Sequence, residues 1–421
     1  MDRPAQSIDS HWFQEFHQLG TFSDISYLVL EEKYLKEQED LFISEKLENP
    51  QLRYWDLESF DINQLKEALL HLNERIGSQE PNEFVRLAYQ RKVEERLEVL
   101  TLLSFAKARA DEKFSQQSEK IYGTVTKEIL AQSIYNLEEY LEKPLRAKNK
   151  AVKGAAMRVM EAFEKFSVRP KKSYDFPLYE QDRRRGKRSR YGARSIRRAF
   201  KKSLRKQGIK EWDVNISKSH LNISVNHRHK LIKVPEGRKI DARGLQALIS
   251  HEVGTHILRG HNGLQSPLQL LSLGLDYYFL LEEGLALHRE FNASGVERRL
   301  GVMDVAIAMA RGVAIKAKNF REIYEILNDY YFAVNVYSKA GKRVHRAHDK
   351  AWRQTLRVFR GTTAQQKGYC FTRNVVYHSG LLKIREYLTQ HPEKEDLLLQ
   401  GKYDPTNEEH IRILQGLGMN V

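Results

Sequence analysis

The sequence contains a single cysteine, Cys370, so no disulfide bond can form within the chain. The first residues, MDRPAQSIDSHW, lack the basic start and apolar stretch of a secretory signal, and we expect none. Long apolar runs are missing as well: the longest, from Leu268 to Leu281, contains Asp276 and is too short and polar to span a bilayer. These absences argue against secreted disulfide scaffolds and membrane-spanning proteins. They predict a soluble protein of a reducing compartment, the cytoplasm.

Acidic residues are missing from one long segment, 183–210, which carries fourteen lysines and arginines. The chain as a whole has a formal net charge of +15, so the remainder is near +1. A basic run of this density attracts polyanions over about 8 Å at physiological salt. It would complement an acidic peptide tail, and nucleic acid or anionic lipid would fit its charge too. The alternative is a solvated helix face.

The remaining composition predicts a mainly helical α+β protein. With 421 residues, 41% of them hydrophobic, the chain can bury one large core or two smaller ones. Apolar residues at helical spacing, such as Leu65, Leu69, Leu72 and Ile76, mark the first half. We therefore expect an N-terminal extension (1–50), a helical region packed on the catalytic part (51–180) and a catalytic region (181–421).

Residues 167–192 contain the prolines and glycines of a linker or exposed loop. An amphipathic helix with a basic outer face follows, from Ala193 to Leu204, and Gly208 ends it. Three short alternating runs predict strands, the last two forming a hairpin: Trp212–Ile216, Leu221–Val225 and Leu231–Val234. Asp241 is a suitable N-cap for the helix that leads into the sequence HEVGTH.

His251, Glu252 and His256 form the pattern H-E-x-x-x-H within that helix. Two imidazoles can hold a zinc ion, and the carboxylate can serve as a base. Residues five apart on a regular helix lie about 140° apart around the axis, too far to share one ion. We therefore predict that the helix takes in an extra residue as a π-bulge, which Gly254 would tolerate.

The third ligand remains open on spacing alone. A glutamate from a second helix, within LLEEGLA (280–286), would give the gluzincin arrangement, and of Glu282 and Glu283 only one should face the metal. His261, five residues after His256, is a rival ligand, and His288 is a further possibility with a supporting or surface role as its alternative.

The combination of motifs resembles the tyrosine carboxypeptidase family, which includes the microtubule-associated tyrosine carboxypeptidases and bacterial relatives with a QEGLA motif. The resemblance covers roughly residues 50–415 and rests on HEVGTHILRGHNG, EEGLA, FSQQSEKIYG (114–123), WDVNI (212–216), LRVFRG (356–361) and YCFTRNVVYHSG (369–380). It implies one zinc ion per chain on His251, His256 and Glu283, in a zincin-like catalytic domain of the gluzincin type. It also implies Glu252 as catalytic acid–base and removal of a C-terminal residue, with tyrosine favoured.

Two positions depart from the family pattern. Glu282 stands beside the expected ligand and could compete for the metal. Relatives commonly carry Lys-Asp where this chain has Arg373 and Asn374, so substrate preference could differ if that pair grips substrate.

An exopeptidase must also bind the free carboxylate of its substrate, which arginine does bidentately. Arg259, Arg360 and Arg373 lie in the matching motifs and are candidates for this clamp, with a structural ion pair as the alternative for each. Tyr377 or His378 could donate a hydrogen bond to the oxyanion. The alternative for Tyr377 is a place in the core.

We therefore expect a zinc metallocarboxypeptidase that acts on a protein or peptide C-terminal tail. One alternative is a gluzincin that cleaves internally or from the N-terminus. Another is a basic binding protein without catalysis, although a structural metal site has no need of a base such as Glu252. Two histidines and a glutamate do not select zinc uniquely among divalent ions.

Overall fold

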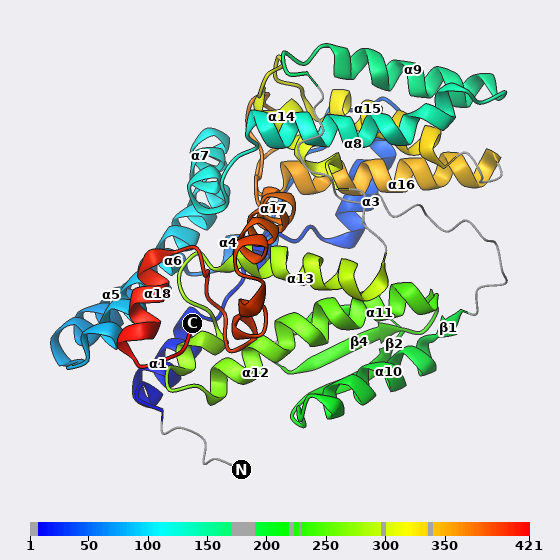
Figure 1. Cartoon of the computed structure of the whole chain (residues 1–421). Coiled ribbons are helices and arrows are strands. Elements are labelled where there is room, and N and C mark those ends of the chain that lie inside the picture. The colour runs from blue at the N-terminus through cyan, green and yellow to red at the C-terminus, as the bar shows by residue number, and fades with distance from the viewer. Residues whose placement is uncertain (1–6, 170–189, 219–222, 227–228, 296–299, 336–339) are drawn as a thin grey trace.

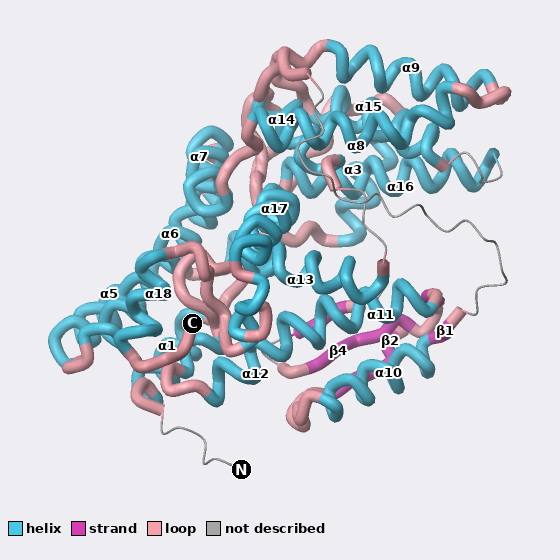
Figure 2. The backbone as a smooth tube through the Cα atoms, viewed as in Figure 1, coloured by secondary structure: helices cyan, strands magenta, loops and turns pink. Residues whose placement is uncertain are grey.

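The computed structural model describes residues 7–169, 190–218, 223–226, 229–295, 300–335 and 340–421. Helices make up most of this part of the chain, and the strands gather in one region (Figure 2). The predicted mainly helical α+β class is confirmed.

The helices before the first strand are α1 (Ser10–Gly20), α2 (Asp24–Tyr27), α3 (Glu32–Ile43), α4 (Trp55–Ser59), α5 (Ile62–Gln79), α6 (Glu83–Lys107), α7 (Asp111–Tyr122), α8 (Lys127–Leu145) and α9 (Lys150–Glu164). The central elements are β1 (Tyr191–Gly192), α10 (Ala193–Lys206), β2 (Asp213–Ser217), β3 (Ser224–Asn226), β4 (Leu231–Pro235), β5 (Lys239–Ile240), α11 (Ala242–His251), the π-helix η1 (Glu252–Ile257), α12 (Leu258–Gln265) and the 3-10 helix η2 (Gln269–Ser272). The last elements are α13 (Phe279–Ser294), α14 (Val302–Arg311), α15 (Phe320–Val334), α16 (Ala340–Phe359), α17 (Val375–Gln390), the 3-10 helices η3 (Pro392–Lys394) and η4 (Leu397–Leu399), and α18 (Glu408–Gly416).

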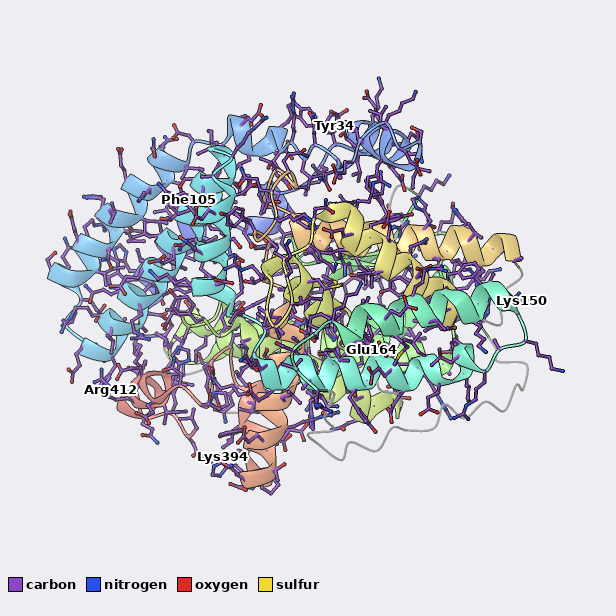
Figure 3. The ribbon with its side chains drawn as sticks, turned by 90° about the horizontal axis from the view of Figure 1, so that it is seen from above. Tyr34, Phe105, Lys150, Glu164, Lys394 and Arg412 are labelled. Carbon is purple, nitrogen blue, oxygen red and sulfur yellow. The ribbon has the colours of Figure 1, made fainter. Side chains whose placement is uncertain are left out.

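The main hydrophobic core unites both ends of the chain. It contains Trp12 from α1, Leu100 from α6, Leu285 from α13 and Leu414 from α18, all nearly inaccessible to solvent. Seen from above, α9 runs from Lys150 at the edge of the molecule to Glu164 near the middle of the view, away from Lys394 and Arg412 (Figure 3). Side chains from all three predicted regions meet in this core, and the boundaries near residues 50 and 180 stay predictions.

Helices α13 and α17 cross in the middle of the molecule (Figure 1). Their backbones touch at two glycines: a Cβ added to Gly284 would lie 2.2 Å from the carbonyl of Gly380, and one added to Gly380 would lie 2.0 Å from the Leu280 carbonyl oxygen. No side chain fits at either position, because real Cβ contacts essentially never fall below 3.0 Å.

A second, smaller core joins α10, the three-stranded sheet and the segment from α11 to α12. Ile196 and Phe200 of α10 meet Val214, Ile232 and other apolar residues of the sheet there. The sheet has the order β2-β4-β3, with β2 parallel and β3 antiparallel to β4. In the separate two-stranded sheet β1 pairs with β5. This arrangement confirms the predicted basic amphipathic helix, which buries Leu204 and exposes Arg194 and Lys202.

The predicted strands agree with β2, β3 and β4 to within a few residues, and β3 and β4 pair as expected of a hairpin. Residues 221–222 of the predicted second strand and 227–228 of its turn lie outside the described residues. So do 170–189, which hold most of the predicted linker and the start of the basic run. Among the described residues, no helix has both the length and the apolar character needed to cross a bilayer.

Candidate functional site

The paired histidines lie on one continuous helical rod formed by α11, η1 and α12. Asp241 begins it, accepting a hydrogen bond from the Gly244 N–H at 2.8 Å, as predicted. The predicted π-bulge is present as the π-helix Glu252–Ile257. Because a π-turn holds an extra residue, it brings His251 and His256 to the same side of the rod.

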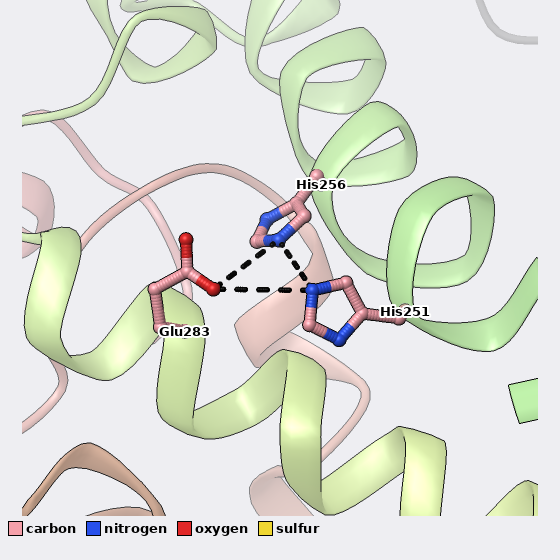
Figure 4. A group of neighbouring side chains, drawn as sticks. All are labelled: His251, His256 and Glu283. Atoms are coloured by element: carbon pink, nitrogen blue, oxygen red, sulfur yellow. Dashed lines mark hydrogen bonds and ion pairs between the residues drawn. The ribbon is translucent and has the colours of Figure 1, made fainter. Parts of the chain in front are cut away.

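Three side-chain donors converge beside this rod (Figure 4). The Nε2 atoms of His251 and His256 lie 3.3 Å apart, and the Glu283 Oε2 on α13 lies 3.9 and 3.7 Å from them. Ligands at about 2.1 Å around a tetrahedral zinc ion lie roughly 3.4 Å from one another. The three donors therefore have the spacing to hold one such ion, and all three residues are buried.

The other nitrogen of each histidine faces its own carboxylate. Glu290 Oε2 lies 3.0 Å from the Nδ1 of His251, and Glu282 Oε1 lies 2.8 Å from the Nδ1 of His256. Since an ionised carboxylate can only accept, each Nδ1 is the donor of its hydrogen bond, which leaves Nε2 as the nitrogen that faces the shared space and can bind a metal once it carries no proton. Carboxylates placed in this way orient histidine ligands and raise their basicity.

The charge balance of the cluster favours a cation. Burial alone would lower the pKa of His256, but the charges of Glu283 and Glu282 outweigh it and raise that pKa to about 9. A cation at the three donors would compete with this proton, so its binding would be linked to proton release.

Both carboxylate oxygens of Glu282 are paired with other side chains and neither is available as a metal ligand. Its second oxygen forms an ion pair with Arg259, which also donates to the carbonyl oxygens of Gly401 (2.8 Å) and Tyr403 (2.9 Å). Burial would raise the pKa of Glu282, but Arg259 and His256 hold it well below its usual range. In this geometry Glu282 orients the ring of His256 and is not itself one of the three converging donors.

The other two histidines considered from spacing lie apart from the cluster. His261 Nδ1 lies 3.0 Å from Glu211 Oε1, and His261 Nε2 lies 2.7 Å from Gln265. His288 contacts Asn292 at 2.9 Å, and burial lowers its pKa. Neither belongs to the group of converging donors found among the described residues.

A cavity of about 580 Å³ opens beside the cluster and is lined by both His251 and Glu252. Tyr377 and His378, at the start of α17, also line it. The charge of Glu283, together with burial, raises the pKa of Tyr377 to about 12. The hydroxyl therefore stays protonated at neutral pH and can donate a hydrogen bond.

A carboxylate on α14 orients the ring of His378. Its Nδ1 lies 2.8 Å from Asp304 Oδ2 on α14, and the Ser133 hydroxyl donates to the same oxygen at 3.1 Å. Because an ionised carboxylate can only accept, Nδ1 of His378 is the donor in this contact. The spacing of the motif gave no indication of Asp304, because it comes from a different helix.

The three arginines predicted as carboxylate clamps are placed differently. Arg259 is buried and bound as described above. Arg373 pairs with Asp24 and lies 4.4 Å over the Phe279 ring; burial would lower its pKa, but Asp24 raises it. Arg360 is half-buried, and burial lowers its pKa. None of these three arginines lines the cavity. Two other residues do: Arg357, and Asn374, which follows Arg373 in the sequence.

Two of the recognised motifs pack against each other and fix the start of α17. Ser115 of α7 donates to the Cys370 carbonyl at 3.0 Å, and the Thr372 N–H donates to the Ser118 hydroxyl at 2.9 Å. Both serines are fully buried. The segment FSQQSEKIYG thus positions the chain that delivers Tyr377 to the cavity.

Sequence reasoning missed Glu290, although a signal was available: it follows Glu283 by seven residues, which places both on the same face of α13. Arg357 was also missed, because its role as a lining residue depends on how α16 packs.

Comparison with known proteins returns one family. The model of the microtubule-associated tyrosine carboxypeptidase family matches residues 174–420. No curated protein and no solved structure shows significant similarity to the chain.

Proposed function

The chain belongs to the microtubule-associated tyrosine carboxypeptidase family, and from this membership we propose that it is a zinc-dependent metallocarboxypeptidase. Its reaction would be removal of the C-terminal residue, tyrosine by preference, from a protein or peptide. The observation that carries the proposal is the convergence of His251, His256 and Glu283 beside Glu252 and a cavity. We assign the catalytic region to the zincin class, of gluzincin type, because a glutamate from a second helix completes the donor set.

The donor set suits zinc, since two neutral imidazoles and one carboxylate are a common catalytic combination for it. When bound, zinc supplies a Lewis acid that polarises a carbonyl and lowers the pKa of water. The protein would hold one ion per chain through these three side chains, with Glu290 and Glu282 fixing the two rings.

Glu252 is the proposed general base. It follows the first ligand directly, lines the cavity, and is close enough to His256 and Tyr377 to affect their pKa values. A carboxylate there can take a proton from water and deliver it to the leaving amine. Tyr377, which lines the cavity, can donate a hydrogen bond to the oxygen that becomes negatively charged. His378, whose Nδ1 faces Asp304, can do so only when its Nε2 also carries a proton.

The substrate is proposed to be a protein or peptide tail. An acidic tail would suit the basic segment 183–210, of which 190–210 lies within the described residues. The cytoplasm remains our prediction for where the reaction takes place.

A peptide labelled near its N-terminus and ending in tyrosine tests the proposal. We expect it to lose one C-terminal residue, and a chelator should stop the reaction. Cleavage at an internal bond or at the N-terminus would favour the endopeptidase or aminopeptidase alternative. Intact peptide, with metal bound, would favour a non-catalytic binding protein.

A further inference from the structure

One face of α16 forms a polar wall of the cavity. Lys350, Gln354 and Arg357 are four and three residues apart, so they lie on the same side of the helix, and all three line the cavity. His251 and Glu252 line the same cavity. A substrate residue in the cavity would therefore contact both α16 and the proposed catalytic groups.

Arg357 is unlike the other arginines near the site. It is exposed, and within the described part of the chain it makes no hydrogen bond or ion pair. Arg259 and Arg373, in contrast, are held by Glu282 and Asp24. A guanidinium that lines a cavity without a carboxylate partner is available to an anionic ligand.

Arg357 and the proposed catalytic groups border one space. Arg357, Tyr377, His251 and Glu252 all line the same cavity of about 580 Å³. In a C-terminal residue, only the amide nitrogen and the Cα separate the free carboxylate from the scissile carbonyl, and adjacent Cα atoms lie about 3.8 Å apart. One amino-acid residue bound in this cavity can therefore present its carboxylate to Arg357 and its peptide bond to the proposed catalytic groups.

We propose that Arg357 binds the free α-carboxylate of the substrate's C-terminal residue. The preceding peptide bond then lies at Glu252 and the three metal donors. This inference rests on the proposed carboxypeptidase function and supplies the group that makes it specific for chain ends. Arginine suits the task because its planar fork matches both oxygens of a carboxylate.

Lys350 is the rival cation in the same wall. Its ammonium lies 5.3 Å over the Tyr331 ring and has that aromatic face as a partner. An ammonium also binds a carboxylate as a point charge rather than as a fork. We therefore assign the carboxylate to Arg357 and keep Lys350 as a comparison in the experiment.

Two peptides that differ only at the C-terminus, one a free acid and one an amide, test the assignment. Wild-type protein should cleave the acid faster, since only the acid can engage Arg357. In Arg357→Gln, kcat/KM for the acid should fall about 10- to 100-fold, the range for a hydrogen bond to a charged group, while the amide rate stays constant. The acid-to-amide ratio should therefore collapse toward one.

Three variants sharpen this result. Arg357→Lys should fall between wild type and Arg357→Gln, and Arg353→Gln, an exposed position on α16 outside the cavity, should keep the wild-type ratio. An unchanged ratio in Arg357→Gln, or a collapse in Lys350→Gln instead, would overturn the proposal.

Binding to a Glu252→Gln variant separates this inference from the proposed function. Fluorescence titration should show tighter binding of the acid than of the amide, and Arg357→Gln should remove the difference in that background. If wild type cleaves neither peptide but this difference appears, the proposed function fails and the carboxylate site stands. If wild type acts on the acid and Arg357→Gln binds both peptides as before, only the carboxylate site fails.

Discussion

At the scale of single residues, the side chains proposed to bind the metal are distinct from the side chain proposed to act as the base. His251, His256 and Glu283 present converging donors, and Glu290 and Glu282 hold the two rings from behind. Glu252 takes no part in this frame and faces the cavity. The frame and the base can therefore be changed independently.

Replacement of the base should affect turnover alone. In Glu252→Gln we expect the bound metal and the melting temperature to stay close to wild type, while kcat falls at least 100-fold, since general-base steps contribute about 10²–10⁴-fold. Elemental analysis and peptide hydrolysis measure the two effects. Near wild-type turnover in this variant would rule out the proposed mechanism.

Replacement of a supporting carboxylate should affect the metal instead. In Glu290→Gln, zinc affinity should fall about 10- to 100-fold, because the acceptor that faces the ring of His251 loses its negative charge. Competition with a coloured chelator would measure this affinity. Glu211→Gln is a matched control, because Glu211 also lies 3.0 Å from a histidine Nδ1, that of His261, away from the site. Equal affinities in both variants would contradict the role given to Glu290.

At the scale of elements, the π-helix determines how α12, the helix that follows it, is rotated about the common helix axis. One residue advances a regular helix by about 100°. If the same sequence formed a regular α-helix, His256 would point about 100° away from its present direction, and so would Arg259 and Gly263 on α12. Arg259 reaches Glu282, and Gly263 is pressed against the Leu271 backbone, where an added Cβ would lie 2.5 Å away.

Deletion of Gly254 should leave the site intact, because it removes the extra residue that the π-turn accommodates and creates the commoner spacing of four residues between the histidines. The segment can then form a regular α-helix with both histidines on one side and α12 in its present rotation, so Arg259 still meets Glu282. We expect stoichiometric zinc and a melting temperature close to that of wild type.

Gly254→Ala is the control for this deletion. The backbone at Gly254 is not left-handed, and an added Cβ would meet its nearest atoms at 3.8 Å, an ordinary contact. The alanine variant should keep metal and stability. If the deletion lost zinc while the alanine variant kept it, the π-helix would do more than accommodate one extra residue.

Local patterns were sufficient to predict several elements. Alternation placed β2 and β4, the basic amphipathic run placed α10, and the unusual histidine spacing predicted the π-helix. These features depend on neighbours in sequence. Gly254 is a partial exception: glycine was expected to ease the distortion, but the backbone there has no need of it.

Contacts between distant elements lay beyond sequence reasoning. Asp304 meets His378 from another helix, and Asp24 meets Arg373 across almost the whole chain. Gly284 of the EEGLA motif lies against Gly380 of α17, which comes almost a hundred residues later in the sequence. Such pairings follow from packing, which no local spacing encodes.

At the scale of the whole molecule, the site lies where the two cores meet. The histidine rod buries Val253 and Ile257 in the smaller core, while α13 buries Leu281 and Leu285 in the larger one. The basic face of α10 belongs to the smaller core's outer surface, where Arg194, Arg198, Lys202 and Arg205 are exposed.

Neutralising those four residues of α10 to glutamine should raise KM for a substrate with an acidic tail and leave kcat unchanged. A remote patch binds the ground state and the transition state equally. The difference should shrink as salt is added, because exposed charges are screened over about 8 Å at physiological ionic strength. A short neutral peptide ending in tyrosine is the control. Equal losses on both substrates would mean that α10 acts on the site itself.

The crossing of α13 and α17 has a consequence for sequence change. Usually a bulky substitution at a helix crossing can be rescued by a smaller residue opposite, but Gly284 and Gly380 already oppose each other without side chains. No second mutation in that pair can make room. In a library randomised at both positions, selection for activity should return glycine at each, with no compensating pairs. An active Gly284→Ala variant that keeps Gly380 would show that the helices can separate without moving Glu283 from Tyr377.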